Sequence, residues 1–190
     1  MASPQNDADD PFDLDFTKIL DPKIEVPEPI PTPQQQIALT GEAEIGEAKL
    51  TSNGYFVRIN EAAPKRPPMS APPLVLVVED DEVTAALLTR ILSANDFRVM
   101  HAANRTQILA GMKATPDLVI LDVLMPDANG FDILNRIRSQ PKLADLPVLM
   151  LTSLGALDDI LKGLKLGANG YLTKPAKSSA LLGAIQQVLF

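Results

Sequence analysis

Five polar residues that could take part in chemistry lie at the ends of apolar runs along the chain: Glu79, Asp80, Asp122, Thr152 and Lys174. Three of them are carboxylates, and like charges held close together raise at least one pKa unless a cation intervenes. Oxygen ligands of this kind suit a hard divalent cation, Mg²⁺ above all. A carboxylate nucleophile beside a hydroxyl and an ammonium supplies the groups that phosphoryl transfer to an aspartate needs.

The elements that would position these residues alternate between strand and helix after residue 73. Short apolar runs predict strands at 74–78, 98–102, 117–122, 147–152 and 170–174. Apolar residues at helical spacing predict helices at 81–92, 106–113, 130–138, 158–166 and 178–189, the fourth ending at Gly167. This order indicates an α/β fold, a doubly wound parallel sheet of five strands with helices on both faces. The site of such a sheet lies at the carboxyl ends of its strands.

The first 73 residues have a different composition from the rest. They contain 12 of the 17 prolines and 12 acidic against six basic residues. We expect a disordered acidic and Pro-rich arm at 1–33, a small element at 34–60, a Pro-rich linker at 61–73 and the folded domain at 74–190. Within 34–60, Asn53-Gly54 is a strong β-hairpin signal, pairing Leu50 with Val57. A transient hairpin inside a disordered arm is the alternative.

Composition also limits the function classes. The chain has no cysteine, which excludes disulfide frameworks and cysteine metal sites, and its one histidine, His101, leaves little room for a histidine-rich metal site or a Ser-His-Asp triad. A net charge of -7 argues against general nucleic-acid binding. The acidic start is unlike a secretory signal, and no apolar run is long enough for a membrane span. We therefore expect a cytoplasmic protein with no direct nucleic-acid partner and no membrane insertion.

Four motifs in the predicted domain together resemble a known family: Val77-Val78-Glu79-Asp80-Asp81, Leu121-Asp122-Val123-Leu124-Met125-Pro126 with Gly130-Phe131, Leu151-Thr152-Ser153, and Gly167-Ala168-Asn169-Gly170-Tyr171-Leu172-Thr173-Lys174-Pro175. They resemble the receiver (CheY-like) domain of bacterial two-component response regulators. The resemblance covers residues 74–190 only. It implies the flavodoxin-like strand order 2-1-3-4-5.

The resemblance also implies roles for single residues. Asp122 is the expected phospho-acceptor of this phosphoprotein, and Lys174 pairs with it. Glu79, Asp80, Asp122 and the backbone carbonyl of Leu124 are the expected Mg²⁺ ligands. Thr152 and Tyr171 are the expected switch residues. The bond between Lys174 and Pro175 is expected to be cis.

The partners implied by the resemblance are a sensor histidine kinase or a histidine phosphotransfer protein, and a downstream protein target. No effector segment follows the final helix, so we expect a stand-alone response regulator of a phosphorelay that signals by protein contact. We expect no enzymatic activity beyond its own phosphorylation and dephosphorylation. A homodimer through the face of helix four, strand five and helix five (158–166, 170–174 and 178–189) is possible.

The alternative is an adaptor whose N-terminal arm binds a partner under receiver control. The acidic-hydrophobic stretch from Phe12 to Leu20 could fold on a partner groove. The hairpin could dock on the receiver and be released on phosphorylation.

Several other residues have ordinary structural interpretations. Asp81 and Glu82 suit the first turn of a helix, and Arg136 and Arg138 a solvated helix face. His101 suits packing or capping rather than phosphoryl donation. A further hypothesis concerns Leu124 and Leu154, which flank the phosphoryl group by resemblance. Because neither can orient an attacking water, we expect slow autodephosphorylation. The alternative is that apolar residues at these positions have no effect on the rate.

Overall fold

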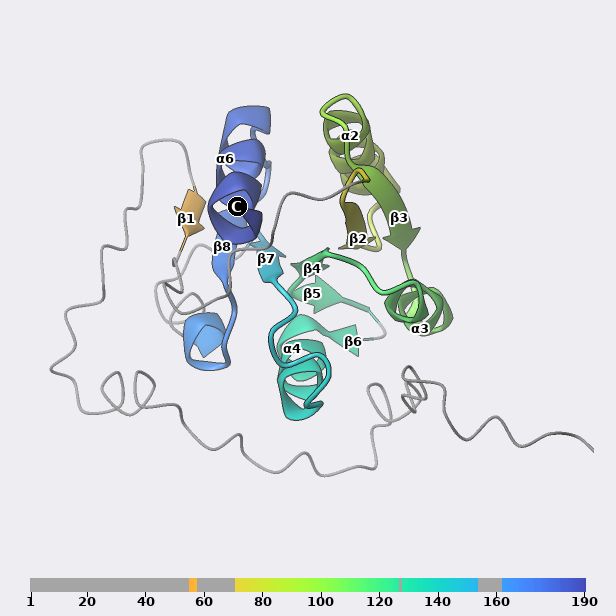
Figure 1. The fold of residues 1–190 in the computed structure, drawn as a ribbon, viewed down its shortest axis with the longest axis vertical. Coiled ribbons are helices and arrows are strands. Elements are labelled where there is room, and N and C mark those ends of the chain that lie inside the picture. The colour runs from red at the N-terminus through yellow and green to blue at the C-terminus, as the bar shows by residue number, and fades with distance from the viewer. Residues whose placement is uncertain (1–54, 58–70, 127, 154–161) are drawn as a thin grey trace, which may run out of the picture.

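The computed structural model describes residues 55–57, 71–126, 128–153 and 162–190. These residues form one six-stranded sheet, a two-stranded ribbon and helices on both sheet faces (Figure 1). The strands of the large sheet are β1 (Tyr55–Val57), β2 (Leu74–Val78), β3 (Arg98–Ala102), β4 (Leu118–Asp122), β7 (Val148–Thr152) and β8 (Gly170–Thr173). The ribbon pairs β5 (Leu124–Met125) with β6 (Ala128–Asn129). The helices with both ends described are α2 (Glu82–Ser93), α3 (Arg105–Lys113), α4 (Gly130–Ser139) and α6 (Ser178–Leu189).

The sheet order is β1-β8-β7-β4-β2-β3. The five strands from β2 to β8 are parallel and follow the predicted 2-1-3-4-5 order. Of the central strands, β2 is apolar throughout, and β4 and β7 are apolar up to their last residues, Asp122 and Thr152, because both faces of the sheet are covered. The predicted doubly wound fold is confirmed, and the predicted and observed strand bounds differ by at most one residue.

Each face of the sheet has its own apolar core. In β2, Leu76 and Val78 lie in the core shared with α3 and α4, whereas Val75 and Val77 lie in the core shared with α2 and α6. This alternation follows from the two-residue period of a strand. Figure 1 shows α2 and α6 above the sheet and α3 and α4 below it.

Helix ends are fixed by local side chains where the sequence provides them. Asp81 is the N-cap of α2 and accepts a hydrogen bond from the Thr84 amide at 2.7 Å, which confirms its interpretation as a helix-start residue. Residues 162–165 are helical, and Gly167 follows with a φ of 91°. Gly167 therefore stops that helix as predicted, because glycine adopts the left-handed conformation without a steric cost.

The prediction that Arg138 lies on a solvated face of α4 is wrong. This side chain is half-buried, and its guanidinium donates to Gly167 O at 2.9 Å, Leu146 O at 2.8 Å and Asn169 Oδ1 at 2.8 Å. Burial lowers the pKa of Arg138 to about 10, while Asp145 acts in the opposite direction. Arg138 thus ties α4 to the loops before β7 and β8.

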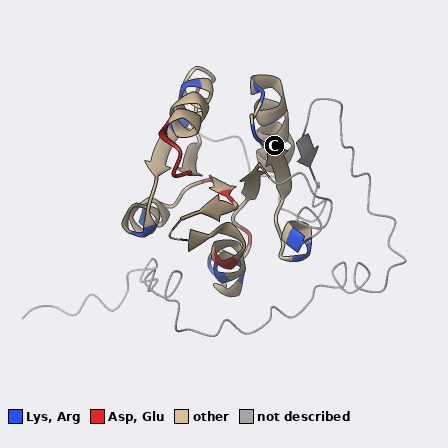
Figure 2. Ribbon diagram, turned by 180° about the vertical axis from the view of Figure 1, so that it is seen from behind, with Lys and Arg blue, Asp and Glu red and all other residues tan. Residues whose placement is uncertain are grey.

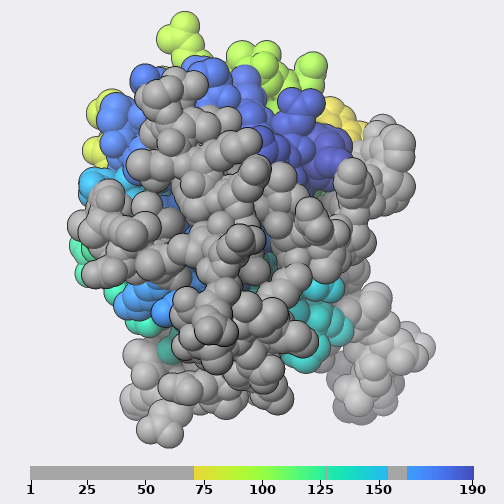
Figure 3. Space-filling view, turned by 90° about the vertical axis from the view of Figure 1, so that its left-hand side faces the viewer, coloured from red at the N-terminus to blue at the C-terminus, as the bar shows by residue number. Residues whose placement is uncertain are grey.

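The strand β1 lies outside the predicted parallel sheet. It pairs antiparallel with β8, with Tyr55 opposite Leu172, Phe56 opposite Tyr171 and Val57 opposite Gly170. The other strand of the predicted hairpin, around Leu50, lies outside the described residues, as do the arm at 1–33 and most of the linker. Figure 3 shows the face of the molecule on the left of Figure 1, where α6 (dark blue) is part of the surface.

Candidate phosphorylation and metal site

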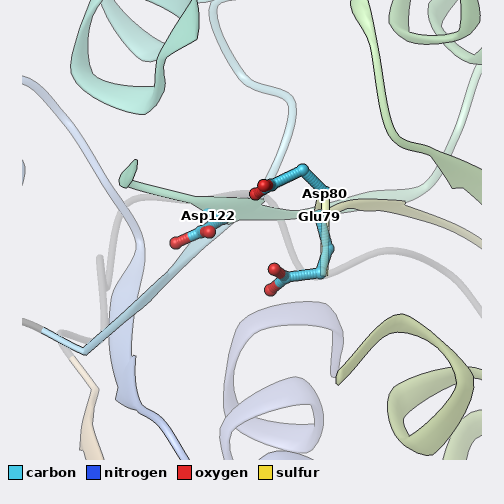
Figure 4. Close-up of side chains that lie close together, drawn as sticks. All are labelled: Glu79, Asp80 and Asp122. Atoms are coloured by element: carbon cyan, nitrogen blue, oxygen red, sulfur yellow. The ribbon is translucent and has the colours of Figure 1, made fainter. Parts of the chain in front are cut away.

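The acidic residues that follow two neighbouring strands converge at one edge of the sheet. Glu79 and Asp80 come directly after β2, and Asp122 is the last residue of β4, the strand beside it. One oxygen from each of the three carboxylates lies within 4.8 Å of the others (Figure 4). In the wider view of Figure 2, the acidic segments at the start of α2 and the end of β4 lie near each other.

Lys174 supplies the positive charge at this edge. It directly follows β8, and its Nζ lies 2.8 Å from Asp122 Oδ2 and 2.7 Å from Glu79 Oε2. It also donates a hydrogen bond to Glu79 Oε1 at 2.8 Å. Glu79 is fully buried and Asp122 nearly so, whereas Asp80 is exposed. One ammonium therefore bridges two buried carboxylates.

The electrostatics of the group follow from burial and proximity. Burial raises the pKa of Glu79, and the Asp122 carboxylate adds to the rise, although the hydrogen bond from Lys174 opposes it. Burial acts to lower the pKa of Lys174, but its bonds to Asp122 and Glu79 outweigh this and leave the pKa raised. The lysine is therefore held as a cation by the carboxylates around it.

The donor set fits a divalent cation. Among the described residues, Glu79 Oε2 is a buried oxygen that lacks a well-aligned hydrogen bond, even though Lys174 Nζ lies near it. Three carboxylates against one ammonium leave an excess of negative charge, and hard oxygen ligands match Mg²⁺. The charge and the oxygen ligands of Glu79, Asp80 and Asp122 therefore fit the predicted ion.

The backbone around Asp122 is fixed by short contacts. The Leu124 amide donates to Asp122 Oδ1 at 3.2 Å, and Leu124 begins the β5–β6 ribbon. A Cβ on Gly130, at the start of α4, would clash with the backbone carbonyl of Asp122. Only glycine allows α4 to begin this close to the end of β4.

The remaining predicted residues lie on β7, the strand beside β4, and on β8, the strand beyond β7. Thr152 is buried at the end of β7, and its carbonyl accepts from the Lys174 amide at 2.8 Å. Tyr171 is buried in the core that contains α4, and a Cβ on Gly163 would clash with its ring. The peptide bond between Lys174 and Pro175 is cis, as expected.

His101 has a contact that the sequence did not indicate. Its Nε2 lies 2.8 Å from the carbonyl oxygen of Glu79, so the protonated nitrogen donates to the backbone of that residue. The Glu79 amide in turn donates to Ala102 O at 3.1 Å. The end of β3 therefore holds the backbone of Glu79. The sequence did indicate that strands end at residues 78 and 102. The contact could be predicted only from the pairing register of β2 and β3, which the sequence does not give.

The comparison with protein families decides the relationship. The response regulator receiver domain matches residues 75–186 of this chain. The chain belongs to the response regulator receiver family. The predicted resemblance is thereby confirmed, and with it the assignment to two-component signalling.

Individual relatives agree with this assignment. The chain is 44% identical over 116 residues to the probable transcriptional regulatory protein SilR of Salmonella typhimurium, covering 60% of this chain and 50% of that protein. It is 40% identical over 116 residues to the transcriptional regulatory protein CusR of Escherichia coli, with the same coverage of each chain. The chain thus spans about half the length of the curated relatives it matches.

Solved structures give the same result. The chemotaxis response regulator CheY4 of Vibrio cholerae is similar with a TM-score of 0.59 and 32% identity, over 63% of this chain and all (100%) of that one. A putative response regulator from Chloroflexus aurantiacus gives a TM-score of 0.59 and 34% identity, over 62% of this chain and 98% of that one. The described part of this chain contains no helix long and apolar enough to cross a membrane.

Proposed function

We propose that the protein is a phosphorelay response regulator that accepts a phosphoryl group on Asp122. One observation carries the proposal: the Asp122 carboxylate lies at the carboxyl end of the sheet, 2.8 Å from Lys174 Nζ, with two more carboxylates within metal-binding distance of it. A phosphohistidine on a sensor kinase or phosphotransfer protein is the expected donor.

The reaction follows from the groups present. An Asp122 carboxylate oxygen forms a bond to phosphorus while the bond between phosphorus and the imidazole nitrogen of the donor breaks. That nitrogen leaves with the electron pair. Lys174 neutralises charge on the transferred group, and the cation bound by Glu79, Asp80, Asp122 and the Leu124 carbonyl would supply further charge neutralisation. The work of the site is positioning and electrostatics.

We expect Thr152 and Tyr171 to act as the switch. The hydroxyl of Thr152 and the amine of Lys174 are the groups that would move toward a new phosphoryl group. Tyr171 lies on β8, three residues before Lys174. A new dianion at Asp122 changes the balance of charge that holds Lys174, which biases the protein between two conformations.

A partner must approach the same edge to deliver the phosphoryl group. Val83 and Leu87 on α2 are 77% and 45% exposed, and Leu124 beside Asp122 is 50% exposed. These exposed apolar side chains give a protein partner a surface that desolvates favourably. The downstream target, in this proposal, is also a protein.

The second candidate is the adaptor, in which the arm before residue 74 carries the output. The pairing of Tyr55–Val57 with β8 favours it, since a segment that precedes residue 74 contacts the receiver sheet. Pull-down of partners with the full chain and with residues 74–190 separates the two. Equal recovery of the partner by both forms would eliminate the adaptor.

Phosphorylation is tested by intact mass after incubation with phosphoramidate, with and without Mg²⁺. The wild-type protein should gain one phosphoryl group only with Mg²⁺. Asp122→Asn should gain none, whereas Asp132→Asn, the same change at an exposed helix position, should behave as wild type. Equal labelling of both variants would contradict the proposal.

A further inference from the structure

The outer edge of β8 is occupied by a segment from outside the matched family domain. Residues Tyr55–Val57 precede the receiver match at 75–186, and they pair antiparallel with β8 while lying beside α6 (Figure 1). The Lys174 amide points toward β7, where it donates to Thr152 O. Because amide directions alternate along a strand, the Tyr171 amide points to the outer edge, where Phe56 lies opposite.

An uncovered edge strand presents unpaired amides and carbonyls that bind other extended segments. We propose that the outer edge of β8 is a strand-binding site, that Tyr55–Val57 occupies it in the unphosphorylated protein, and that phosphorylation of Asp122 weakens this pairing. The phosphorylation step rests on the proposed function. The strand β1 then acts as a displaceable internal cover of the receiver's β8 edge.

The connection between the two sites is the strand β8 itself. Its last residue is followed by Lys174, whose Nζ contacts Asp122 and Glu79, and its Tyr171 lies opposite Phe56. A phosphoryl group on Asp122 would compete with Glu79 for the lysine and so change the force on the end of β8. Because β8 is only four residues long, we expect a movement at this end to alter the twist that the strand offers to β1.

The cover is weak enough to be displaced. A three-residue antiparallel pair makes only a few backbone hydrogen bonds, and each contributes modestly to stability in water. Residues 58–73 tether β1 to β2, which sets an effective concentration on the order of millimolar. We therefore expect the paired and unpaired forms to be close in free energy, so that a small bias at Asp122 shifts their populations.

Coupling of this kind is reciprocal. If phosphorylation lowers the equilibrium constant for β1 pairing by a given factor, β1 pairing lowers the equilibrium constant for the phosphorylated conformation by the same factor. Disruption of β1 should therefore raise the fraction of the phosphorylated conformation at a fixed phosphodonor concentration.

The two tyrosines of the chain give a direct readout, because Tyr55 lies in β1 and Tyr171 in β8. In full-length protein labelled with 3-fluorotyrosine, each strand contributes one ¹⁹F resonance, and Tyr55→Phe assigns them. On phosphorylation by phosphoramidate and Mg²⁺, we expect the Tyr55 resonance to move toward its position in the unfolded protein. If mass shows phosphorylation and Tyr171 responds while Tyr55 does not, the coupling is overturned and the proposed function stands.

The pairing itself is tested without phosphorylation. Phe56→Pro removes a backbone donor and should increase amide hydrogen exchange at Tyr171 about tenfold, whereas Phe56→Val, which keeps the donor, should not. Equal exchange in the two variants would overturn the strand-binding site. If no phosphoryl group is gained, the proposed function and the coupling both fail, and the exchange comparison still decides the pairing.

Discussion

Two cationic side chains at opposite ends of the parallel sheet illustrate different uses of charge. Lys174, at the carboxyl end, bonds to the buried carboxylates Glu79 and Asp122. Arg138, toward the amino end, bonds to neutral acceptors on Leu146, Gly167 and Asn169. Ionic partners can be exchanged when a new charge arrives, whereas carbonyl partners offer no such exchange. We infer that the sheet has one responsive end and one fixed end.

The largest effect that would test this contrast is on stability. Arg138→Ala removes a donor from Leu146 O and from Gly167 O and one of the two donors to Asn169 Oδ1, and it should lower the free energy of unfolding by about 2–4 kcal/mol. Chemical denaturation measures it, with the exposed Lys113→Ala as a control that should stay within about 0.5 kcal/mol of wild type. The phosphorylation rate of the folded fraction should be unchanged. A stability loss no larger than that of the control would break the contrast.

At the responsive end, the main effect should be on rate. Lys174→Met removes the amine that neutralises the transferred group, so phosphorylation by phosphoramidate should slow about tenfold or more. Intact mass against time measures it. Lys177→Met, the same change at an exposed position three residues on, should phosphorylate like wild type. Similar rates for the two variants would contradict a role for Lys174 in charge neutralisation.

A third change sharpens the contrast within the core. Gly163→Ala places a methyl group against the Tyr171 ring and should displace it, at a stability cost of about 1–3 kcal/mol. The ¹⁹F resonance of Tyr171 should then move without any phosphodonor. Gly183→Ala in α6, at a half-exposed position, should leave that resonance in place. An unmoved resonance in Gly163→Ala would show that the ring is not held by Gly163.

The smallest predicted effect concerns the lifetime of the phosphorylated state. Leu124→Asn adds a polar group that can orient water beside Asp122, and dephosphorylation should quicken about threefold, well below the effect of a full general base. Decay of the phosphorylated mass measures it. Leu87→Asn, an exposed leucine on α2, is the control. An unchanged lifetime would contradict the hypothesis that apolar residues beside the phosphoryl group slow its hydrolysis. The other residue of that hypothesis, Leu154, lies outside the described residues.

The parallel sheet and the acidic cluster could be predicted because their signals are local. Apolar runs fixed the strands within one residue, and the ends of those runs placed Asp122 and Lys174 on the same edge. Arg138 was misplaced because the helical pattern indicates only which side of α4 is apolar. The acceptors of Arg138 come from loops distant in sequence, and no local pattern reports them.

Long-range register explains the other omissions. His101 meets the Glu79 carbonyl only because β3 and β2 are aligned with Ala102 opposite Val78. Likewise, Asn53-Gly54 predicted a strand near Tyr55 that could dock on the receiver, but nothing in the sequence indicated that it would pair with β8. The two-residue strands of the β5–β6 ribbon are too short to show a period.

The central claim is that Asp122 carries the phosphoryl group, and chemical mapping tests it most directly. Borohydride reduces the acyl phosphate of an aspartate to homoserine, which peptide mass mapping locates in the chain. After incubation with phosphoramidate and Mg²⁺, we expect homoserine at position 122 alone, and none without Mg²⁺. Homoserine at another aspartate, or no conversion at 122 in excess Mg²⁺, would contradict the account.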